Sequence, residues 1–579
     1  MRIVYLEVEN FRGIKKLSWS PSAKFNCLIG PGDSAKTTIL DAIELVLTPR
    51  SYAFADDSDF HNLDYNQPIR IVATIAGLPP EFIADDRYGL HLRGWNADAA
   101  KVEDEPRAGL ESALSLQLTV DKTHEARWSV FNDRIAADQE SDPPSLKYID
   151  AQTLATTRLG PYAERHLGWG RQSVLNRLGD AAETLGGQMA DASRAAREAF
   201  TKGNPSVFKD TAERAEKLGK LFAVPIRDKY GAALDVQGVN ISAGGISLHD
   251  GKLPLRRLGT GSSRLIVSAL QHDASGSHVA LIDEIEHGLE PHRIARLLKY
   301  LKAPADAGST SPSQIFITTH SPVVIRELNA ADIFTVRAEA GMVRVTAADA
   351  AAADPNTAQK HLRAAPDAFL ARKVVVCEGR TEQGLCRGLD AYWSLHEGKE
   401  SFALRGLIEI NGNGNASALV LADHLANLGY DVFLLLDTDE RADEQKLTEL
   451  RGKGVRVHEW PDNVATEERI FLDVPWASVQ ALVKFACECV NADSVMAQIN
   501  KVAKAAGAAE LSSLDLPTTL DTEAMRSILG KAAKNKDRPW FKDITRGEEL
   551  AAILGPVLAK IPDNPLALGM GAFRAWVDG

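Results

Sequence analysis

Two aspartates follow a short apolar run in the C-terminal half of the chain. The run Val432–Leu436 ends directly on Asp437, and Asp439 follows at the next alternate position. Successive residues of a strand point to opposite faces, so these two carboxylates lie on the same side where the strand ends. Carboxylate oxygens are hard ligands of the kind that Mg²⁺ or Mn²⁺ prefers. The spacing therefore predicts a divalent-metal site.

A second pair of acids stands earlier in the chain. The strand predicted over Lys373–Cys377 ends on Glu378, and Glu382 enters the helix that follows. The next predicted strand, Gly406–Ile410, runs into the tight turn Asn411–Asn415, and the helix predicted after this turn leads to the strand that bears the two aspartates. Alternating strands and helices with acids at strand ends predict a parallel sheet whose site lies beyond its carboxyl edge. The four acids can converge there.

The N-terminal part of the chain contains a candidate phosphate-binding loop. The segment Gly30–Thr38, GPGDSAKTT, follows a predicted strand at Phe25–Ile29 and precedes an apolar-periodic helix. In such a loop backbone N–H groups hold the phosphates, Lys36 reaches the terminal phosphates and Thr37 holds Mg²⁺. Ala35 stands at the second glycine of the usual pattern. If this position needs a positive φ, its Cβ costs about 1 kcal/mol, so weak or slow nucleotide turnover is expected.

Three further segments have residue types that an ATPase needs. The apolar strand predicted over His278–Ile282 ends on Asp283 and Glu284, and another buried strand ends on His320. The Gly/Ser-rich loop Leu258–Arg264 opens a helix. Taken singly, the two acids could cap a helix, the histidine could be a hydrogen-bonded turn residue and the glycines could form a turn. Together, in this order and each at a strand end or helix start, they indicate nucleotide hydrolysis.

This order of motifs resembles the ATP-binding-cassette ATPases, in particular the heads of DNA-repair and chromosome-maintenance proteins. The resemblance implies that the Gly/Ser loop of one protomer closes on the nucleotide held by another, giving an ATP-sandwich homodimer. It implies ATP with Mg²⁺ as cofactor and Glu284 as the residue that activates water. The implied nucleotide-binding positions are Gly30, Ala35, Lys36, Thr37, Thr38, Gly261, Ser262, Asp283 and His320, with Thr37 and Asp283 holding the metal.

A helical segment interrupts the ATPase part. From Arg171 to Ala223 the chain is rich in Ala, Leu, Arg and Glu, with apolar residues at helical spacing. Gly203–Pro205 breaks the run. We interpret it as a short arm that most simply serves dimerisation; the alternative is a helical subdomain packed on its own head.

The expected organisation has two α/β parts. Between Arg337 and Pro366 the strand–helix rhythm is lost, which predicts a linker, although Ala-rich sequence can also be helical. The expected boundaries are residues 1–160 and 231–348 for the ATPase head, 161–230 for the helical insertion, 349–370 for the linker and 371–579 for the C-terminal domain.

The C-terminal motifs resemble the Toprim domain of topoisomerases, primases and certain nucleases. The shared pattern is a glutamate after the first strand, a Gly-containing turn after the second and Asp-x-Asp after the third. The whole arrangement, an ATP-binding-cassette head with a helical insertion and then a parallel α/β Toprim domain, is similar to the OLD family of nucleases, named for overcoming lysogenization defect. That family includes the nuclease subunit of the Gabija antiphage system, whose partner is a helicase, and members without one.

The resemblance implies further site residues. In that family another glutamate and a basic residue near the C-terminus complete the metal site, and Glu467 or Glu468 and Lys542 offer them here. Either glutamate could instead be a solvated helix start, and Lys542 an ordinary surface lysine. The implied ligands of two Mg²⁺ or Mn²⁺ ions are Glu378, Glu382, Asp437, Asp439 and one of Glu467 and Glu468, with Lys542 neutralising charge on the phosphate.

Composition bears on nucleic-acid binding and on the cellular compartment of the protein. The 579 residues carry a formal charge of −12, which argues against wrapping nucleic acid over the whole surface but allows a local basic patch such as Lys531–Arg538. No apolar stretch approaches the roughly 20 residues that span a bilayer. The five cysteines are an odd set without Cys-x-x-Cys, typical of reduced thiols. These features, with an N-terminus unlike a secretory signal, predict a cytoplasmic protein.

The function expected from these motifs is metal-dependent cleavage of DNA, regulated by ATP at a dimerising head, in antiphage defence or DNA processing. Three alternatives stay open. A strand-passage enzyme needs a nucleophilic tyrosine, yet no tyrosine follows Asp439, and Tyr430 begins the metal-bearing strand. A non-catalytic, ATP-driven DNA clamp or sensor would keep the carboxylates for structure. Cleavage of RNA is a narrower variant.

Overall fold

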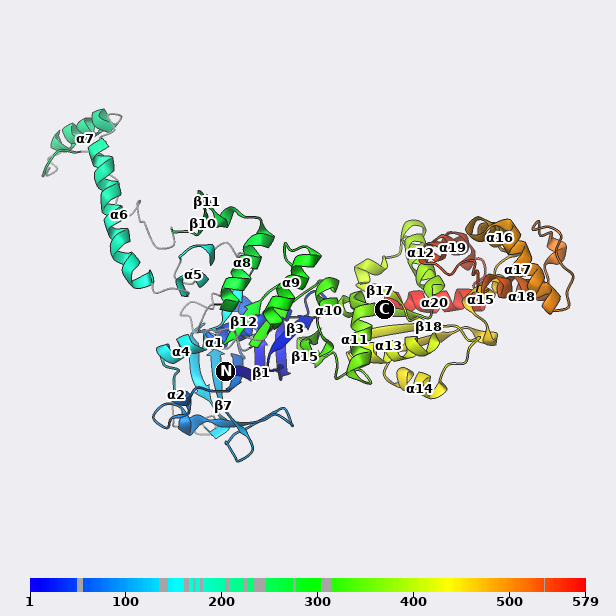
Figure 1. The fold of residues 1–579 in the computed structure, drawn as a ribbon, viewed down its shortest axis with the longest axis horizontal. Coiled ribbons are helices and arrows are strands. Elements are labelled where there is room, and N and C mark those ends of the chain that lie inside the picture. Colours follow the sequence, from blue (N-terminus) through cyan, green and yellow to red (C-terminus); the bar gives the residue numbers. More distant parts are fainter. Residues whose placement is uncertain are drawn as a thin grey trace.

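The computed structural model describes residues 1–48, 56–134, 144–160, 166–169, 173–177, 181–203, 208–221, 227–230, 232, 246–273, 278–303, 314–535 and 537–579. The molecule is elongated, with a large mixed sheet in one half, a smaller parallel sheet with a helical layer in the other, and two helices that project from the first half (Figure 1). The ends of the predicted helical segment, Arg171 and Ala223, lie outside the described residues, as do Pro205 of its predicted break and Lys536 within the basic stretch.

The large sheet combines an antiparallel and a parallel portion. Its antiparallel strands are apolar on at least one face and join through short turns, as antiparallel ribbons allow. In spatial order they are β6 (Lys101–Glu103), β5 (Arg93–Asn96), β7 (Glu111–Val120), β4 (Ile69–Ala76), β1 (Arg2–Phe11) and β2 (Ile14–Trp19), with β8 (Ala126–Phe131) also on β7. The order continues with β15 (Met342–Ala347), β14 (Ile333–Glu339), β3 (Phe25–Ile29), β13 (Gln314–Thr318), β12 (Val279–Ile282) and β9 (Thr157–Leu159).

The parallel portion brings distant motifs to one edge. Strand β13 pairs in parallel with both β3 and β12, and all three strands are completely buried. Fully buried, mostly apolar strands of this kind belong in the middle of a covered parallel sheet. Their carboxyl ends therefore lie side by side, so the segments that follow Ile29, Ile282 and Thr318 meet there.

Helices cover this portion of the sheet. They are α1 (Lys36–Leu47), α8 (Thr260–Asp273), α9 (Pro291–Lys302) and α10 (Pro322–Glu327). Helix α9 begins with a proline at its first position, where the missing N–H costs nothing, and buries Ile294, Leu297, Leu298 and Leu301 on one face. The shorter α2 (Pro80–Ile83), α4 (Tyr148–Leu154) and α5 (Val174–Arg177) and the hairpin of β10 (His249–Asp250) and β11 (Leu253–Pro254) flank this half.

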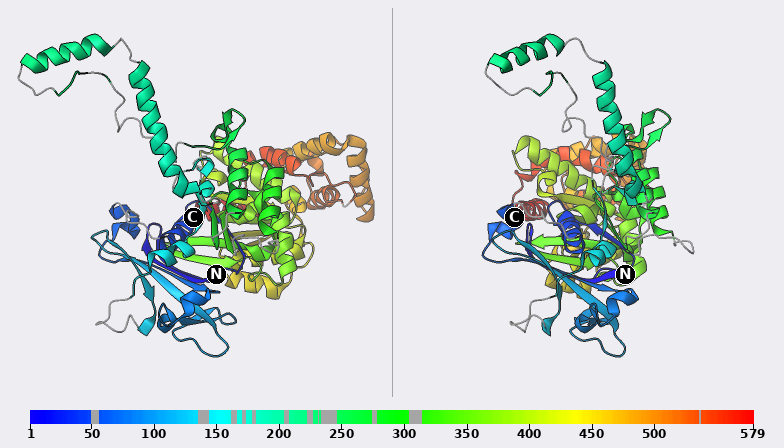
Figure 2. Two further views of the ribbon diagram at one scale, coloured as in Figure 1. Left: turned by 60° about the vertical axis from the view of Figure 1, so that its left-hand side comes forward. Right: turned by 90° about the vertical axis from the view of Figure 1, so that its left-hand side faces the viewer.

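Two helices of the predicted arm extend away from the sheet. Helix α6 spans Ala181–Gly203 and α7 spans Lys209–Leu221, and Figures 1 and 2 show both standing clear of the large sheet. Leu218 and Leu221 of α7 are 50% and 74% exposed. Among the described residues, α6 and α7 therefore form a projection rather than a subdomain packed on the head.

The expected linker at 349–370 is folded in the structure. Helix α11 spans Pro355–Ala364, capped by Asp354, and a 3-10 helix spans Pro366–Leu370. Their side chains Ala358, Leu362 and Phe369 are buried in a core that continues from the ATPase half into the C-terminal half. The segment joins the two halves through packing as well as through the chain.

The C-terminal sheet is parallel throughout, in the order β17 (Leu407–Asn411), β16 (Lys373–Cys377), β18 (Asp431–Leu436) and β19 (Arg456–Glu459). Alternate residues of its strands face different layers. Val374 and Val432 face the layer that contains α13 (Asn415–Asn427) and α14 (Glu444–Gly452), whereas Val375 and Phe433 face the layer of α12 (Arg380–His396).

The second layer is a helical block that holds α12 in place. It comprises α15 (Thr466–Asp473), α16 (Trp476–Val490), α17 (Ala492–Ala505), α18 (Glu523–Ala533), α19 (Ile544–Leu558) and α20 (Pro565–Asp578). Helix α19 lies directly against α12, because Gly384 and Gly547 face each other and a Cβ on Gly384 would lie only 2.2 Å from the carbonyl oxygen of Ile544. This close contact fixes the helix that carries Glu382.

Candidate functional site

The candidate phosphate-binding loop has the predicted strand–loop–helix context. It connects β3 to α1, and Ala35 is the residue before the helix, with φ 72° and ψ 17°. This is the left-handed region, where a Cβ is unfavourable by about 1 kcal/mol relative to glycine. Ala35 therefore has the positive φ at which a Cβ is costly, and the loop stores strain at this residue.

Lys36 lies inside its own loop. Its ammonium donates to the carbonyl oxygens of Gly30 at 3.0 Å and Pro31 at 2.7 Å and to Oγ of Ser34 at 3.2 Å. Burial lowers the pKa of Lys36 to about 8, although nearby acids, Asp33 first, oppose this. An anion at the helix N-terminus would favour the charged form and give this lysine a partner in place of the loop carbonyls.

Asp283 is the centre of a hydrogen-bond network at the adjacent strand end. Its Oδ1 accepts from the hydroxyls of Thr37 at 3.2 Å and Thr318 at 2.6 Å. Thr37 and Asp283 are thus close enough to hold a Mg²⁺ ion together. Glu284 follows in a left-handed conformation, φ 47°, with its side chain exposed. The strand end thus fixes Asp283 and leaves Glu284 open to solvent.

His320 stands at the neighbouring strand end, and Glu286 orients its turn. The Glu286 carboxylate accepts from the backbone N–H of His320 and from the hydroxyl of Thr319, both at 2.7 Å. Burial and then the charge of Lys36 lower the pKa of His320. Glu286 was not among the predicted site residues. In the sequence, the feature that pointed to Glu286 was its place in the same acidic segment, two positions after Glu284.

The Gly/Ser loop forms the first turn of α8 and packs against the segment that follows β12. A Cβ on Gly261 would lie 2.1 Å from the carbonyl oxygen of Gly288, so only glycine fits there. The hydroxyl of Ser262 accepts from Arg293 at 3.2 Å. Buried Arg264 donates to the backbone carbonyl of Asp283 at 2.7 Å. The structure thus ties this loop to the acid-bearing strand within one chain.

The second site lies at the carboxyl edge of the parallel C-terminal sheet. Glu382, Asp437 and Glu467 each offer a carboxylate oxygen, and these atoms all lie within 4.8 Å of one another. They come from the first turn of α12, the end of β18 and the first turn of α15. The first two were predicted to converge, and the structure brings them together. Of the two candidate glutamates, Glu467 is the one that joins them.

Hydroxyls and backbone N–H groups orient these carboxylates. Thr466 donates to Oδ1 of Asp437 through its N–H at 2.9 Å and its hydroxyl at 2.8 Å. The hydroxyl of Thr381 donates to Oε1 of Glu467 at 2.9 Å. The two threonines were missed in the sequence, where each is simply the neighbour of a predicted ligand at a helix start. They hold the acids in fixed positions, as a preformed metal site requires.

The three acids destabilise one another's charges. Burial, followed by the charge of Glu467, raises the pKa of Glu382 to about 7. Burial raises the pKa of Asp437 well above its ordinary value, with Glu382, Glu467 and Glu378 adding to the effect. The pKa of Glu467 is raised by burial as well. A divalent cation would offset this repulsion, so the oxygen-only donor set fits Mg²⁺ or Mn²⁺.

The other predicted residues lie around this cluster and contact different partners. Glu378 accepts from the backbone N–H of Asp437 at 2.9 Å. Lys542 is exposed and lines the same pocket, whose volume is about 400 Å³. Asp439 and Glu468 instead pair with Lys534, at 3.0 and 2.6 Å. The six predicted acids therefore form two groups, one that shares a pocket with Lys542 and one that is bridged by Lys534.

Tyr430 is not positioned to act as a nucleophile beside the acids. Its hydroxyl donates to the carbonyl oxygen of Phe369 at 2.6 Å, and its ring contacts the guanidinium of Arg337. It precedes β18, whereas the acids follow the strand at its other end. This geometry disfavours the strand-passage alternative.

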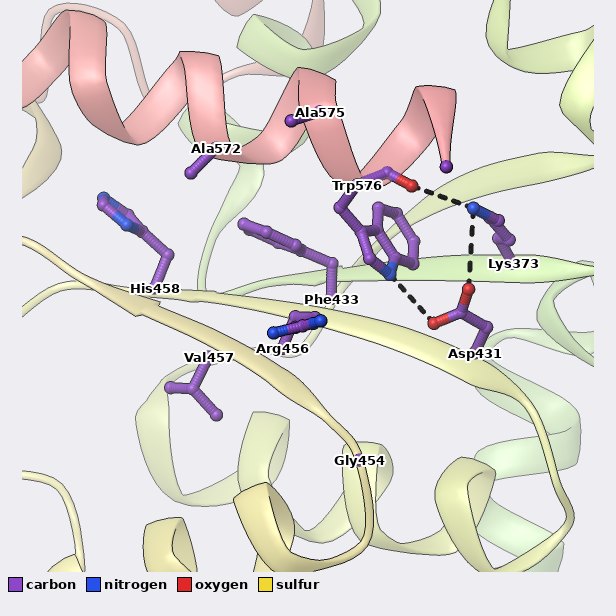
Figure 3. A pocket seen from close by; sticks show the side chains of 11 residues that line it. Lys373, Asp431, Phe433, Gly454, Arg456, Val457, His458, Ala572, Ala575 and Trp576 are labelled. Atoms are coloured by element: carbon purple, nitrogen blue, oxygen red, sulfur yellow. Dashed lines mark hydrogen bonds and ion pairs between the residues drawn. The ribbon is translucent and has the colours of Figure 1, made fainter.

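A larger cavity, of about 750 Å³, lies between β18, β19 and the end of α20 (Figure 3). Three of the residues at its rim bond to one another. Lys373 donates to the carbonyl oxygen of Trp576 at 2.8 Å, and the indole N–H of Trp576 donates to Asp431 at 2.8 Å. These contacts fasten the last helix to the sheet. We therefore interpret the cavity rim as structural.

Family models match the N-terminal part of the chain. Residues 1–149 match the model described as an AAA ATPase domain, and residues 99–326 match the model described as an AAA domain, putative AbiEii toxin, Type IV TA system. No curated protein matches the chain. In the part of the chain that the structure describes, no helix is long and apolar enough to cross a membrane.

Several solved structures are similar to this chain over 60% of its length. One is the SmcHead bound to the C-winged helix domain of ScpA, with 15% identity, a TM-score of 0.34 and 98% of that chain covered. A second is an Smc head domain from Pyrococcus furiosus bound to the C-terminal domain of ScpA, with 13% identity, a TM-score of 0.34 and 96% covered. A third is the recombination mediator RecF, with 13% identity, a TM-score of 0.29 and 98% covered.

The family matches identify an AAA-type ATPase domain within residues 1–326. Such a domain binds ATP with Mg²⁺, and the candidate phosphate-binding loop and Asp283 lie inside the matched region. Both matches end before the parallel C-terminal sheet.

Proposed function

We propose that this protein is a divalent-metal-dependent DNA endonuclease regulated by its ATPase domain. The observation that carries the proposal is the cluster of Glu382, Asp437 and Glu467, whose carboxylate oxygens lie within 4.8 Å of one another at the edge of a parallel sheet. Buried acids with raised pKa values need either protons or a cation. A divalent ion held by these three residues would supply a Lewis acid for hydrolysis of a phosphodiester.

The residues around the cluster have complementary tasks in this proposal. The exposed ammonium of Lys542 neutralises charge on the phosphate, because it lies at the mouth of the pocket that Glu378 and Glu382 line. Helices α12 and α13 begin in the same pocket, so the positive ends of their dipoles favour an anion there. The basic stretch from Lys531 to Arg538 steers DNA toward the site despite the net negative charge of the chain.

ATP controls access to this site in the proposal. Nucleotide held by Lys36, Thr37 and Asp283 would be enclosed by the Gly/Ser loop of a second copy, and the projecting arm of α6 and α7 would add contacts between the copies. The continuous core through α11 supports transmission of a change in the head to the C-terminal sheet. We propose a role in antiphage defence or DNA processing in the cytoplasm, with a helicase as a possible partner in the Gabija-like case.

Plasmid cleavage in Mg²⁺ or Mn²⁺, with and without ATP, tests the proposal. We expect the wild type to nick or linearise the plasmid and Glu467→Gln to reduce cleavage by at least a hundredfold. Glu397→Gln, at the far end of α12 and exposed, serves as the matched control and is expected to cleave like the wild type. Lys36→Ala is expected to abolish the response to ATP but to leave the metal site intact.

The alternatives give different results in the same assay. A non-catalytic clamp or sensor predicts binding of DNA without scission under any combination of metal and nucleotide. Preferential cleavage of RNA over DNA at equal concentrations would redefine the substrate. Full cleavage by Glu467→Gln would show that the acidic cluster is not the catalytic centre.

A further inference from the structure

Lys534 lies where a second cation would otherwise be expected. It follows directly after the last residue of α18, and its ammonium lies 3.0 Å from Oδ2 of Asp439 and 2.6 Å from Oε2 of Glu468. The side chain of Glu468 is only 6% exposed, and those of Lys534 and Asp439 are 30% and 28% exposed. The contact is therefore a half-buried bridge between two acids from separate elements.

Backbone packing determines this position of Lys534. Helix α18 approaches α15 at Gly530, where a Cβ would lie 2.7 Å from Cα of Glu468. Lys534 lies one turn further along, and its backbone N–H donates to the carbonyl of Gly530. Its side chain therefore reaches the carboxylate of Glu468. The carboxylate of Glu468 also accepts from the N–H of Ala465 at 3.1 Å, which fixes it at the start of α15.

The two groups of acids at this edge therefore differ in their partners. Glu382, Asp437 and Glu467 converge and rely on hydroxyl and N–H donors. Asp439 and Glu468 have a lysine between them. Since two of the six acids already share a protein cation, a second divalent ion would have to displace a lysine that makes two charge-assisted hydrogen bonds.

We propose that Lys534 is a built-in cation that takes the place of the second divalent ion, so that the resting site holds a single Mg²⁺ or Mn²⁺ at Glu382, Asp437 and Glu467. Lys534 acts as a positioning residue that keeps Asp439 and Glu468 away from the ion. This proposal rests on the proposed function, because it assumes that the three-carboxylate cluster binds metal. It replaces the expectation of two resident ions with one ion and one lysine.

Binding of Mn²⁺ to the nucleotide-free full-length protein, followed by electron paramagnetic resonance of free Mn²⁺, tests the stoichiometry. We expect one tightly bound ion per chain in the wild type and in Lys531→Met, which removes an exposed lysine from the same helix. Lys534→Met is expected to gain a second ion, bound at least tenfold more tightly than any second ion of the wild type. Lys534→Arg keeps the charge and is expected to retain one ion.

Thermal unfolding provides a readout that does not depend on cleavage. Without metal, Lys534→Met leaves Asp439 and Glu468 without their shared cation and is expected to unfold at a lower temperature than the wild type. Mn²⁺ is expected to raise the unfolding temperature of this variant more than that of the wild type. Two equally tight ions in the wild type, or an unchanged stoichiometry in folded Lys534→Met, would overturn the role of Lys534. Mn²⁺ binding that Glu467→Gln leaves unchanged would instead overturn the metal centre itself, and with it this proposal.

Discussion

Nη2 of Arg158 lies 3.0 Å from Oδ2 of Asp283, the residue that also accepts from Thr37. Arg158 additionally pairs with Asp41 and, at 3.3 Å, with Glu44, both on the helix that follows the phosphate-binding loop. Its side chain is 12% exposed. A single guanidinium therefore joins three acids around the candidate ATPase site and links the loop helix to the acid-bearing strand.

Arg158→Met is expected to destabilise the ATPase domain. Loss of the guanidinium leaves three poorly exposed carboxylates without their shared partner, which costs about 3–5 kcal/mol for buried pairs. The unfolding temperature of the full-length protein is the measurement. Arg127→Met is the control, because Arg127 is 72% exposed in a surface ion pair and its loss is expected to change stability by less than about 0.5 kcal/mol. Equal unfolding temperatures for the two variants would contradict the structural role of Arg158.

Ala35→Gly is expected to stabilise the loop. The native φ of 72° is unfavourable for alanine and accessible to glycine, so relief of strain is worth about 1 kcal/mol, reduced in part by the greater freedom of glycine in the unfolded chain. Ala42→Gly in the middle of α1 is the matched control and is expected to lose stability, because that residue is helical and buried. Comparison of the two unfolding temperatures checks the sign, and a loss of stability in both variants would argue against strain at Ala35.

Thr466→Val is expected to weaken binding of Mn²⁺ about fivefold, equivalent to about 1 kcal/mol for one hydrogen bond. Its hydroxyl donates to Asp437 and accepts from the indole N–H of Trp460 at 2.8 Å. Valine keeps the shape but supplies neither contact, so Asp437 loses orientation. Thr466→Ser restores the hydroxyl and should recover affinity. Titration with Mn²⁺ measures the affinity of both variants and of the wild type. Equal affinities of Thr466→Val and the wild type would show that the Thr466 hydroxyl does not support metal binding.

The junction between the two halves is expected to loosen in acid. Nδ1 of His361 on α11 lies 3.0 Å from Nδ1 of His424 on α13, and burial, followed by the charges of His424 and Lys360, lowers the pKa of His361 to about 4 while Asp354 opposes this. The unfolded chain takes up the proton near pH 6.5 and the folded chain only near pH 4, so stability falls as the pH drops through this window.

The size of this effect is of the order of 1 kcal/mol once partial solvent exposure is allowed for. Thermal unfolding of wild type and His361→Asn at pH 7.5 and pH 5 measures it. The wild type should lose more stability between the two pH values than the variant does. His396→Asn, an exposed histidine at the end of α12, should behave like the wild type. The same pH dependence in His361→Asn as in the wild type would exclude the pair as its cause.

Much of the site was predictable because it depends on local sequence. A short apolar run with β-branched residues forms a buried strand, and the first polar residue after it lies at the sheet edge. This is why Asp283, Glu378 and Asp437 at strand ends, and Lys36 at the start of its helix, agree with the predicted elements within a residue or two. The strand predicted at 406–410 is found at Leu407–Asn411, a shift of the kind that local patterns do not resolve.

The sequence alone determined the order of strands, loops and acids, and hence an ATPase region followed by a parallel sheet with carboxylates at its edge. Only the tertiary structure separated Glu467 from Glu468, because neighbouring residues at a helix start differ by about 100° in direction and the packing of α15 decides which one faces the sheet. It also placed Lys534 beside Asp439 and Arg158 beside Asp283, and it made the expected linker a packed helix. These contacts join residues far apart in the chain, and their positions depend on close helix approaches, such as that of Gly530 to Glu468, that no local pattern encodes.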